Sequence, residues 1–159
     1  MSNINLKETV ENLIDIFLDA GKISLELRDK GLKKEIKSDN TPVSNGDLEV
    51  NKLLTKRINE LTPNIPIVSE ESSDNKNNEK LKDFWLIDPI DGTYDYINNL
   101  DEFTINAGLI IEKKPAAGLI FAPAKNRMFY SYGKNQAFEL INGKIFKLNS
   151  SKHFDKNEI

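Results

Sequence analysis

Phe84-Trp85-Leu86-Ile87-Asp88-Pro89-Ile90-Asp91-Gly92-Thr93 joins an apolar run to a turn that carries two aspartates. Asp88 and Asp91 are three positions apart, and Pro89 between them fixes its own φ and so restricts the turn. Two carboxylates in one turn repel each other unless a cation or several donors neutralise them. The Gly-Thr pair that follows opens a helical or turn-like segment, whose N–H groups can face an anion. The stretch therefore predicts a buried strand that ends in an acidic turn suited to a metal and a phosphate.

A second acidic element lies upstream, where Ser69-Glu70-Glu71-Ser72 follows the short apolar run at 65–68. Neighbouring residues of an extended chain point in opposite directions, so we expect only one of Glu70 and Glu71 to bind a metal directly. The other could orient a water molecule, or the pair could be solvated at a strand end. Two strand ends with paired carboxylates are what Mg²⁺ requires, because it takes oxygen ligands from a few carboxylates and from water and phosphate.

Asp47 has a structural explanation at this point. Ser44 is a good helix N-cap, and Asp47 three residues later occupies the capping-box position. His153 is the only histidine and lies in a polar tail, so an imidazole base is not expected.

The order of the elements predicts the fold class. Apolar residues at helical spacing predict one helix over about 6–28 and a second from Ser44 to Leu61, which Thr62-Pro63 ends. Gly21 inside the first helix marks a close approach to a neighbour, because glycine costs about 1 kcal/mol there. Short apolar runs follow at 65–69, 84–88, 103–111, 116–122, 127–132, 136–141 and 144–148, and Asn142-Gly143 predicts a type I′ hairpin between the last two.

This pattern predicts an α+β fold with two N-terminal helices packed on a largely antiparallel sheet. We expect one metal- and phosphate-binding domain over 1–149 and a polar tail over 150–159. The polar stretch from Ser72 to Lys80 is expected to be a solvated connection.

Composition excludes several classes of function. The chain has 159 residues, a net charge of −3 and no cysteine, so disulfides, thiolate metal sites and cysteine nucleophiles are ruled out. No apolar run reaches about 18 residues, so no membrane span is expected, and the N-terminus shows no signal peptide. No basic stripe is present, so nucleic acid is not an expected partner. A cytoplasmic location is the expectation.

Aspartyl-phosphate enzymes of the haloacid dehalogenase type offer a competing interpretation, because they also place Asp and then Asp-Gly-Thr after an apolar strand. One residue separates the two aspartates in that family, whereas Pro89 and Ile90 both intervene here. The extra residue changes the direction in which the second aspartate faces. The later lysine-bearing and acidic motifs of that family are also not apparent, so this interpretation ranks lower.

Taken together, Asp47, Glu70-Glu71 and the 88–93 hexamer resemble the inositol monophosphatase superfamily of Mg²⁺-dependent, lithium-sensitive phosphatases. The stretches 37–44, 102–106 and 118–123 look most like the 3′(2′),5′-bisphosphate nucleotidases of bacterial sulfur assimilation. The resemblance implies the N-terminal domain of the inositol monophosphatase and sugar phosphatase fold. It also implies removal of the 3′-phosphate of adenosine 3′,5′-bisphosphate to give AMP.

The resemblance implies that four residues bind metal and that a fifth lies behind them. Glu70, Asp88 and the backbone carbonyl of Ile90 would hold a first Mg²⁺. Asp88 would bridge to a second Mg²⁺ that it shares with Asp91, and Glu71 would lie behind these ligands and orient a water.

The same resemblance implies a phosphate-binding and a catalytic role beside the metals. The N–H groups of Gly92 and Thr93 would bind the phosphate. Thr93, paired with Asp47, would orient and help deprotonate the attacking water, so Asp47 would act both as a cap and as a catalytic partner.

The chain departs from the family in one respect. The distal Trp-Asp motif is missing, since Trp85 is the only tryptophan, so we expect the family's C-terminal domain to be absent and a second metal to bind weakly. Self-association or a completing domain is a possible partner. Two alternatives to a bisphosphate nucleotidase stay open: an inositol monophosphatase, and a non-catalytic fragment or subunit that binds metal and phosphate.

Overall fold

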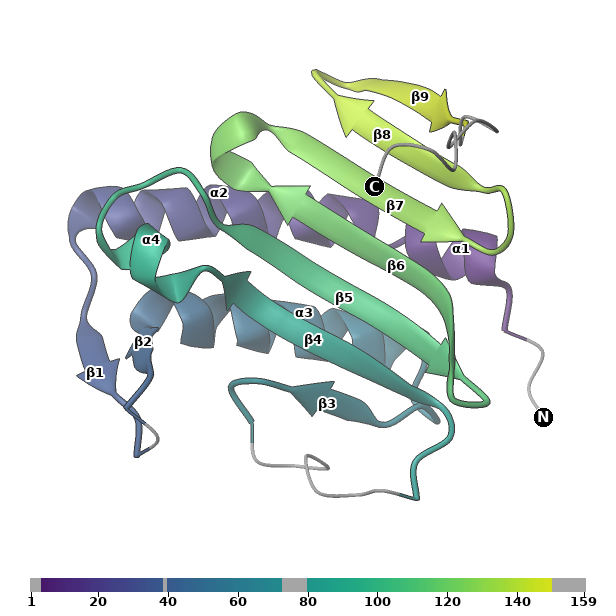
Figure 1. Ribbon diagram of the computed structural model, residues 1–159, viewed down its shortest axis with the longest axis horizontal. Helices are drawn as coiled ribbons and strands as arrows, with labels where there is room; N and C mark the ends of the chain where they lie inside the picture. Colours follow the sequence, from purple (N-terminus) through teal and green to yellow (C-terminus); the bar gives the residue numbers. More distant parts are fainter. Residues whose placement is uncertain (1–3, 39, 73–79, 150–159) are drawn as a thin grey trace, which may run out of the picture.

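A seven-stranded sheet with helices on one face forms the described part of the chain (Figure 1). The computed structural model describes residues 4–38, 40–72 and 80–149. The predicted tail at 150–159, with His153, and most of the predicted solvated connection lie outside these residues.

The sheet order follows the chain order. Its strands are β3 (Ile67–Ser69), β4 (Phe84–Asp91), β5 (Thr104–Ile111), β6 (Lys114–Ala122), β7 (Arg127–Tyr132), β8 (Ala137–Ile141) and β9 (Lys144–Leu148). Strands β3 and β4 pair in parallel, and every other neighbouring pair in this sheet is antiparallel. The prediction of an α+β fold with a largely antiparallel sheet is confirmed.

The helices are α1 (Leu6–Glu11), α2 (Ile14–Lys30), α3 (Asn45–Leu61), α4 (Thr93–Ile97) and the 3₁₀ turn η1 (Pro123–Lys125). The single helix predicted over about 6–28 is wrong, because the chain breaks between α1 and α2. The N–H of Leu13 bonds to the carbonyl of Val10, an i to i+3 turn that tightens the end of α1. The break directs Leu13 into the core, where it is fully buried.

One face of the sheet and the inner faces of α1, α2 and α3 share the hydrophobic core. Alternate strand residues supply it, as in β5, where Ile105, Ala107 and Leu109 are buried between less buried neighbours. A Cβ added to Gly21 of α2 would lie 2.2 Å from the ring of Phe121 on β6. The predicted close approach at Gly21 is therefore confirmed.

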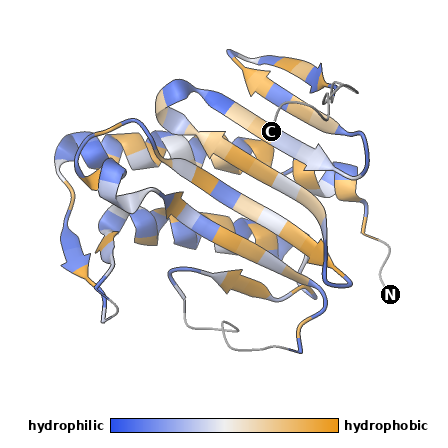
Figure 2. Cartoon of the chain, in the orientation of Figure 1, coloured by the Kyte–Doolittle hydropathy of each residue, from blue (hydrophilic) through white to orange (hydrophobic). Residues whose placement is uncertain are grey.

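The opposite side of the sheet is an open face, defined here by Leu86, Asn106, Gly108, Ile120 and Phe129, which no helix of the described residues covers (Figures 1 and 2). Leu86 and Ile120 are about half exposed on it. These residues line a hollow of about 550 Å³. Among the described residues, no helix is long and apolar enough to cross a membrane.

Two hairpins show what sequence patterns detect and miss. Asn142 and Gly143 both have positive φ and join β8 to β9, so the predicted tight hairpin is confirmed. A second hairpin, β1 (Lys34–Ile36) paired with β2 (Pro42–Ser44), was not predicted. Residues 33–40 look polar and all residues of β1 are exposed, so no alternation of apolar residues reveals the strand.

Candidate functional site

The end of β4 carries both aspartates of the 84–93 stretch. The strand was predicted to end at Asp88 but continues to Asp91, with a shift of register between these two residues. Pro89 lies at this irregularity, where a strand tolerates a residue that has no N–H to donate. Asp88 lies opposite Asn106 of β5, and Asp91 lies opposite Thr104. The irregularity accommodates the extra residue between the two carboxylates.

The end of β3 brings Glu70 to the same edge, because β3 and β4 run parallel and their carboxyl ends lie together. The N–H of Glu70 bonds to the carbonyl of Ile87 at 3.1 Å, and its carboxylate lies close enough to Asp88 to raise the pKa of that group. The side chain of Glu70 is 44% exposed and that of Glu71 only 4%. As expected for adjacent residues, the two carboxylates occupy different environments.

The N-terminus of α3 forms the third side of the site. The side chain of Ser44 caps the helix, and the N–H of Ser44 bonds to Asp47 Oδ2 at 2.8 Å, so the predicted capping box is confirmed. Asp47 is almost completely buried. Its other carboxylate oxygen, Oδ1, accepts a hydrogen bond from the hydroxyl of Thr93 at 3.0 Å.

The turn into α4 places Thr93 between two acceptors. Its hydroxyl lies 3.0 Å from Asp47 Oδ1 and 3.0 Å from the backbone carbonyl of Ile90. Gly92 has a φ of +92°, and a Cβ there would lie 2.7 Å from the carbonyl of Glu102. The turn thus requires glycine, which lets the chain fold back sharply from β4 and direct Thr93 toward α3.

Negative charge is concentrated around Asp88. Burial, together with the negative charges of Glu70 and Asp91, raises the pKa of Asp88 to about 7. One oxygen of its carboxyl, Oδ1, is buried and has no hydrogen-bond partner among the described residues. A buried carboxylate oxygen without a donor beside two other carboxylates favours the binding of a cation.

Sequence reasoning missed a lysine at this site. Lys37 in the β1–β2 hairpin places its ammonium 2.8 Å from Glu71 and 3.3 Å from Glu70. Burial alone would lower the pKa of Lys37, but the hydrogen bond and charge of Glu71, with Glu70, raise it overall. Burial raises the pKa of Glu71, and Lys37 offsets part of that rise. The contact could not be predicted because the hairpin that delivers Lys37 was not predicted.

The oxygen atoms of the site are the ligand type that a hard divalent cation binds, but the side chains that carry them are not yet close enough together to coordinate one. Glu70, Asp88, Asp91 and the carbonyl of Ile90 supply only oxygen atoms, as Mg²⁺ or Ca²⁺ requires. In the part of the chain that the structure describes, no three acidic or histidine side chains already converge at coordinating distance. The ammonium of Lys37 lies 3.3 Å from the carboxylate of Glu70, where a cation would compete with it.

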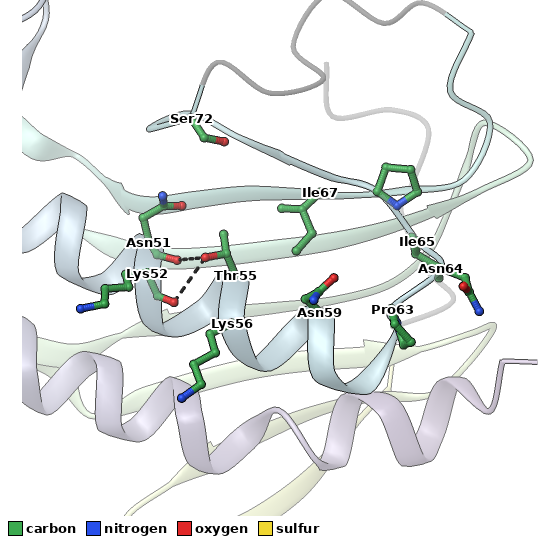
Figure 3. Close-up of a pocket in the computed structure, with 11 residues that line it drawn as sticks. Asn51, Lys52, Thr55, Lys56, Asn59, Pro63, Asn64, Ile65, Ile67 and Ser72 are labelled. Carbon is green, nitrogen blue, oxygen red and sulfur yellow. Dashed lines mark hydrogen bonds between the residues drawn. The ribbon is translucent and has the colours of Figure 1, made fainter.

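Among the described residues, no carboxylate lines a separate groove between α3 and β3 (Figure 3). Asn51, Thr55 and Asn59 of α3 line one side and Ile67 of β3 lies opposite. The hydroxyl of Thr55 donates within its own helix to the carbonyl of Asn51 at 2.7 Å. The groove is therefore a polar hollow outside the acidic site.

Comparisons with known proteins identify the family of the chain. The profile of the inositol monophosphatase family matches residues 5–159. The 3′(2′),5′-bisphosphate nucleotidase CysQ of Haemophilus influenzae is 37% identical over 118 residues, which cover 73% of this chain and 44% of that protein. CysQ proteins of other bacteria are 31–33% identical.

Solved structures share the fold. The inositol monophosphatase of Thermotoga maritima superposes with a TM-score of 0.73 at 24% identity, over 86% of this chain and 52% of that one. A phosphatase described as IMPase/NADP phosphatase, solved with Mg²⁺ and phosphate, superposes with a TM-score of 0.72 at 20% identity, over 86% and 52%. The chain spans about half the length of the curated relatives it matches. On the match of its sequence from residue 5 to residue 159, the chain belongs to the inositol monophosphatase family.

Proposed function

We propose that this chain carries the metal and phosphate site of a Mg²⁺-dependent phosphomonoesterase that converts adenosine 3′,5′-bisphosphate to AMP and phosphate. One observation carries the proposal: the acidic strand ends that hold Glu70, Asp88 and Asp91 lie beside the buried Asp47–Thr93 pair. Metal ligands and a proton acceptor are the two parts that hydrolysis of a phosphate ester needs. The substrate is proposed because the curated relatives are CysQ nucleotidases.

Glu70, Asp88, Asp91 and the carbonyl of Ile90 would hold the divalent cation. When bound, such cations neutralise the phosphate and stabilise the attacking and leaving oxygens of an in-line displacement. The charges of Glu70 and Asp91 both act on Asp88 and raise its pKa, so Asp88 is close to both carboxylates. It is therefore the side chain that two cations would share. Glu71 would lie behind these metal ligands and orient a water molecule, and Lys37 fixes the position of its carboxylate.

The Asp47–Thr93 pair would handle the proton of the attacking water. A threonine hydroxyl has one proton, and Asp47 Oδ1 and the Ile90 carbonyl are both within reach of it. If the Ile90 carbonyl faces a cation, the proton of Thr93 goes to Asp47. The lone pairs of Thr93 then point away from Asp47 and can accept a hydrogen bond from water. The N–H groups of Gly92 and Thr93 would bind the phosphate from the other side.

The open face supports a proposal that a further domain or a second polypeptide packs against the sheet. The curated relatives are about twice as long as the part of them that this chain matches. Leu86 and Ile120 are apolar and about half exposed, and a further domain or a second polypeptide would cover them. We propose that full activity and substrate selectivity require that addition, and that the enzyme is cytoplasmic. An inositol monophosphatase with the same site is the second candidate, and a subunit that binds metal and phosphate without turnover is the third.

Phosphate release from adenosine 3′,5′-bisphosphate and from inositol 1-phosphate tests these candidates. The assay is run with Mg²⁺, with EDTA, and with Mg²⁺ plus Li⁺. Mg²⁺-dependent, Li⁺-suppressed release with the nucleotide preferred supports the proposal. Preference for inositol 1-phosphate would support the second candidate. Binding of Mg²⁺ without release from either ester would support the third.

A further inference from the structure

Asn106 of β5 lies directly opposite Asp88 in the antiparallel β4–β5 ladder. Opposed residues of such a ladder have Cβ atoms only about 5 Å apart, so their side chains share one local environment. Asn106 also lines the hollow of the open face together with Asp88. It therefore stands where the acidic site meets the open face.

The orientation of the Asn106 amide follows from its partner. Its Nδ2 lies 3.2 Å from Asp91 Oδ2. An ionised carboxylate only accepts hydrogen bonds, so the amide must present its N–H to Asp91 and its oxygen elsewhere. That oxygen, Oδ1, is buried and, within the described residues, accepts no hydrogen bond.

Two buried acceptors without a donor thus lie on directly opposed residues: Oδ1 of Asn106 and Oδ1 of Asp88. They are the only two such side-chain atoms among the described residues. Leaving a buried polar group unpaired is costly, so two such oxygens on opposed residues call for a donor or a cation. A carboxylate oxygen beside an amide oxygen is a pair that a hydrated divalent cation satisfies.

We propose that Asn106 is a positioning residue of the acidic site. Its amide N–H fixes Asp91, and its amide oxygen adds an acceptor beside Asp88 for a hydrated divalent cation. The inference rests on the proposed function in one respect, that the acidic strand ends bind such a cation. Residues that orient metal ligands change metal affinity by about 10- to 100-fold when they are removed.

Mn²⁺ binding followed by electron paramagnetic resonance, with no substrate present, tests the proposal. Asn106→Ala loses both contacts and should weaken Mn²⁺ binding about tenfold. Asn106→Asp exchanges the amide for a carboxylate and should bind Mn²⁺ more tightly than Asn106→Ala does. Asn59→Ala, at an exposed asparagine in the α3 groove, is the matched control and should bind as the unchanged chain does.

Melting temperatures in EDTA separate positioning from a merely structural role. Asn106→Ala removes an unpaired acceptor, which favours folding, and also the N–H donor to the Asp91 carboxylate, which opposes it. Because the two effects offset each other, this variant should melt near the unchanged chain. Asn106→Asp adds a fourth carboxylate beside Glu70, Asp88 and Asp91 and should melt lower. The proposal therefore predicts opposite orders for metal affinity and for stability. If Mn²⁺ affinity instead follows melting temperature across the variants, or Asn106→Ala binds Mn²⁺ normally, the proposal is wrong.

Asp88→Asn distinguishes this failure from failure of the site itself. Loss of Mn²⁺ binding in Asp88→Asn together with normal binding in Asn106→Ala would overturn only the role of Asn106. Unchanged binding in both variants would overturn the metal site and, with it, the proposed function.

Discussion

Thr93 donates a hydrogen bond to Asp47 across 46 positions of the chain, and that bond joins the end of the β4 turn to the first turn of α3. The same aspartate uses its other oxygen to cap α3 through Ser44. The helix cap thus fixes the orientation of the carboxylate that faces Thr93. A residue that sequence alone explains as a cap therefore also contacts Thr93 of the proposed site.

Asp47→Asn should slow turnover about 10²- to 10³-fold, within the range of a lost general base, while leaving Mn²⁺ binding intact. The amide oxygen can still accept from Ser44, but its NH₂ would then face Thr93 and redirect the hydroxyl proton to the Ile90 carbonyl. Turnover per folded molecule is the measurement, with the folded fraction from circular dichroism. A variant that unfolds but keeps its rate per folded molecule would show that Asp47 is only a cap.

Asp88→Asn should abolish Mg²⁺-dependent phosphate release and Mn²⁺ binding, yet raise stability in EDTA. The carboxylate of Asp88 is half-buried and is repelled by Glu70 and Asp91. Replacing it by a neutral amide removes that repulsion, which in this partly exposed site is worth roughly 1 kcal/mol or a rise of about 2–4 °C in Tm. Retained Mg²⁺-dependent release in this variant would contradict the site assignment. A lower Tm would contradict the electrostatic argument.

The parts of the site that local patterns encode could be predicted from sequence. Apolar runs gave the strands, and the Ser44 to Asp47 spacing gave the cap, because both depend on residues close in the chain. The break before Leu13 was missed because helical spacing continues through it. Lys37 was missed because its contacts with two glutamates, 33 and 34 positions away, depend on the unpredicted β1–β2 hairpin. Tertiary pairing of exposed strands leaves no periodic trace in a sequence.

Lys37→Met should bind Mn²⁺ several-fold more tightly and melt at a lower temperature. The substitution removes a positive charge that repels a cation and that pairs with the partly exposed Glu70, and pairs of this kind are worth up to about 1 kcal/mol. It also leaves the buried carboxyl of Glu71 without this partner, which destabilises the fold. Titration with Mn²⁺ and thermal melts in EDTA measure the two effects.

Lys34→Met is the matched control, because Lys34 lies in the same hairpin and bonds to a backbone carbonyl, that of Ile97. It should leave Mn²⁺ affinity unchanged. Equal affinities of the unchanged chain and Lys37→Met would show that Lys37 does not compete with the cation.

Metal binding should depend on pH through Asp88. A cation needs the ionised carboxylate, and the pKa of Asp88 is raised to about 7, so apparent Mn²⁺ affinity should fall as pH drops from 8 to 6. Stability in EDTA should change in the opposite sense. The folded state holds the proton more tightly than an unfolded chain with an ordinary aspartate pKa near 4, so stability should fall as pH rises from about 4 to 7. Asp88→Asn should flatten that stability profile, and an unchanged profile would assign the pH dependence to another group.

Gly46→Ala should destabilise the fold and impair the site together. A Cβ at Gly46 would lie 2.3 Å from Tyr96 Oη, and Tyr96 is fully buried with its hydroxyl bonded to the carbonyl of Ser24 at 2.6 Å. The ring therefore cannot move aside, and overpacking of this kind costs about 1–3 kcal/mol. Because Gly46 directly precedes Asp47, the overpacking should displace Asp47 and lengthen its contact with Thr93. Turnover should therefore fall more than the folded fraction does.

Gly108→Ala supplies the matched control, because a Cβ there would meet no atom within 4 Å on the open face. Melting temperature should stay within about 2 °C of the unchanged chain for Gly108→Ala and drop by several degrees for Gly46→Ala. If both variants melt alike, the space beside Tyr96 is not what requires glycine at position 46. If Gly46→Ala melts lower but keeps full turnover per folded molecule, Asp47 holds its position through Ser44 alone, and the packing of α4 against α3 has no part in placing it.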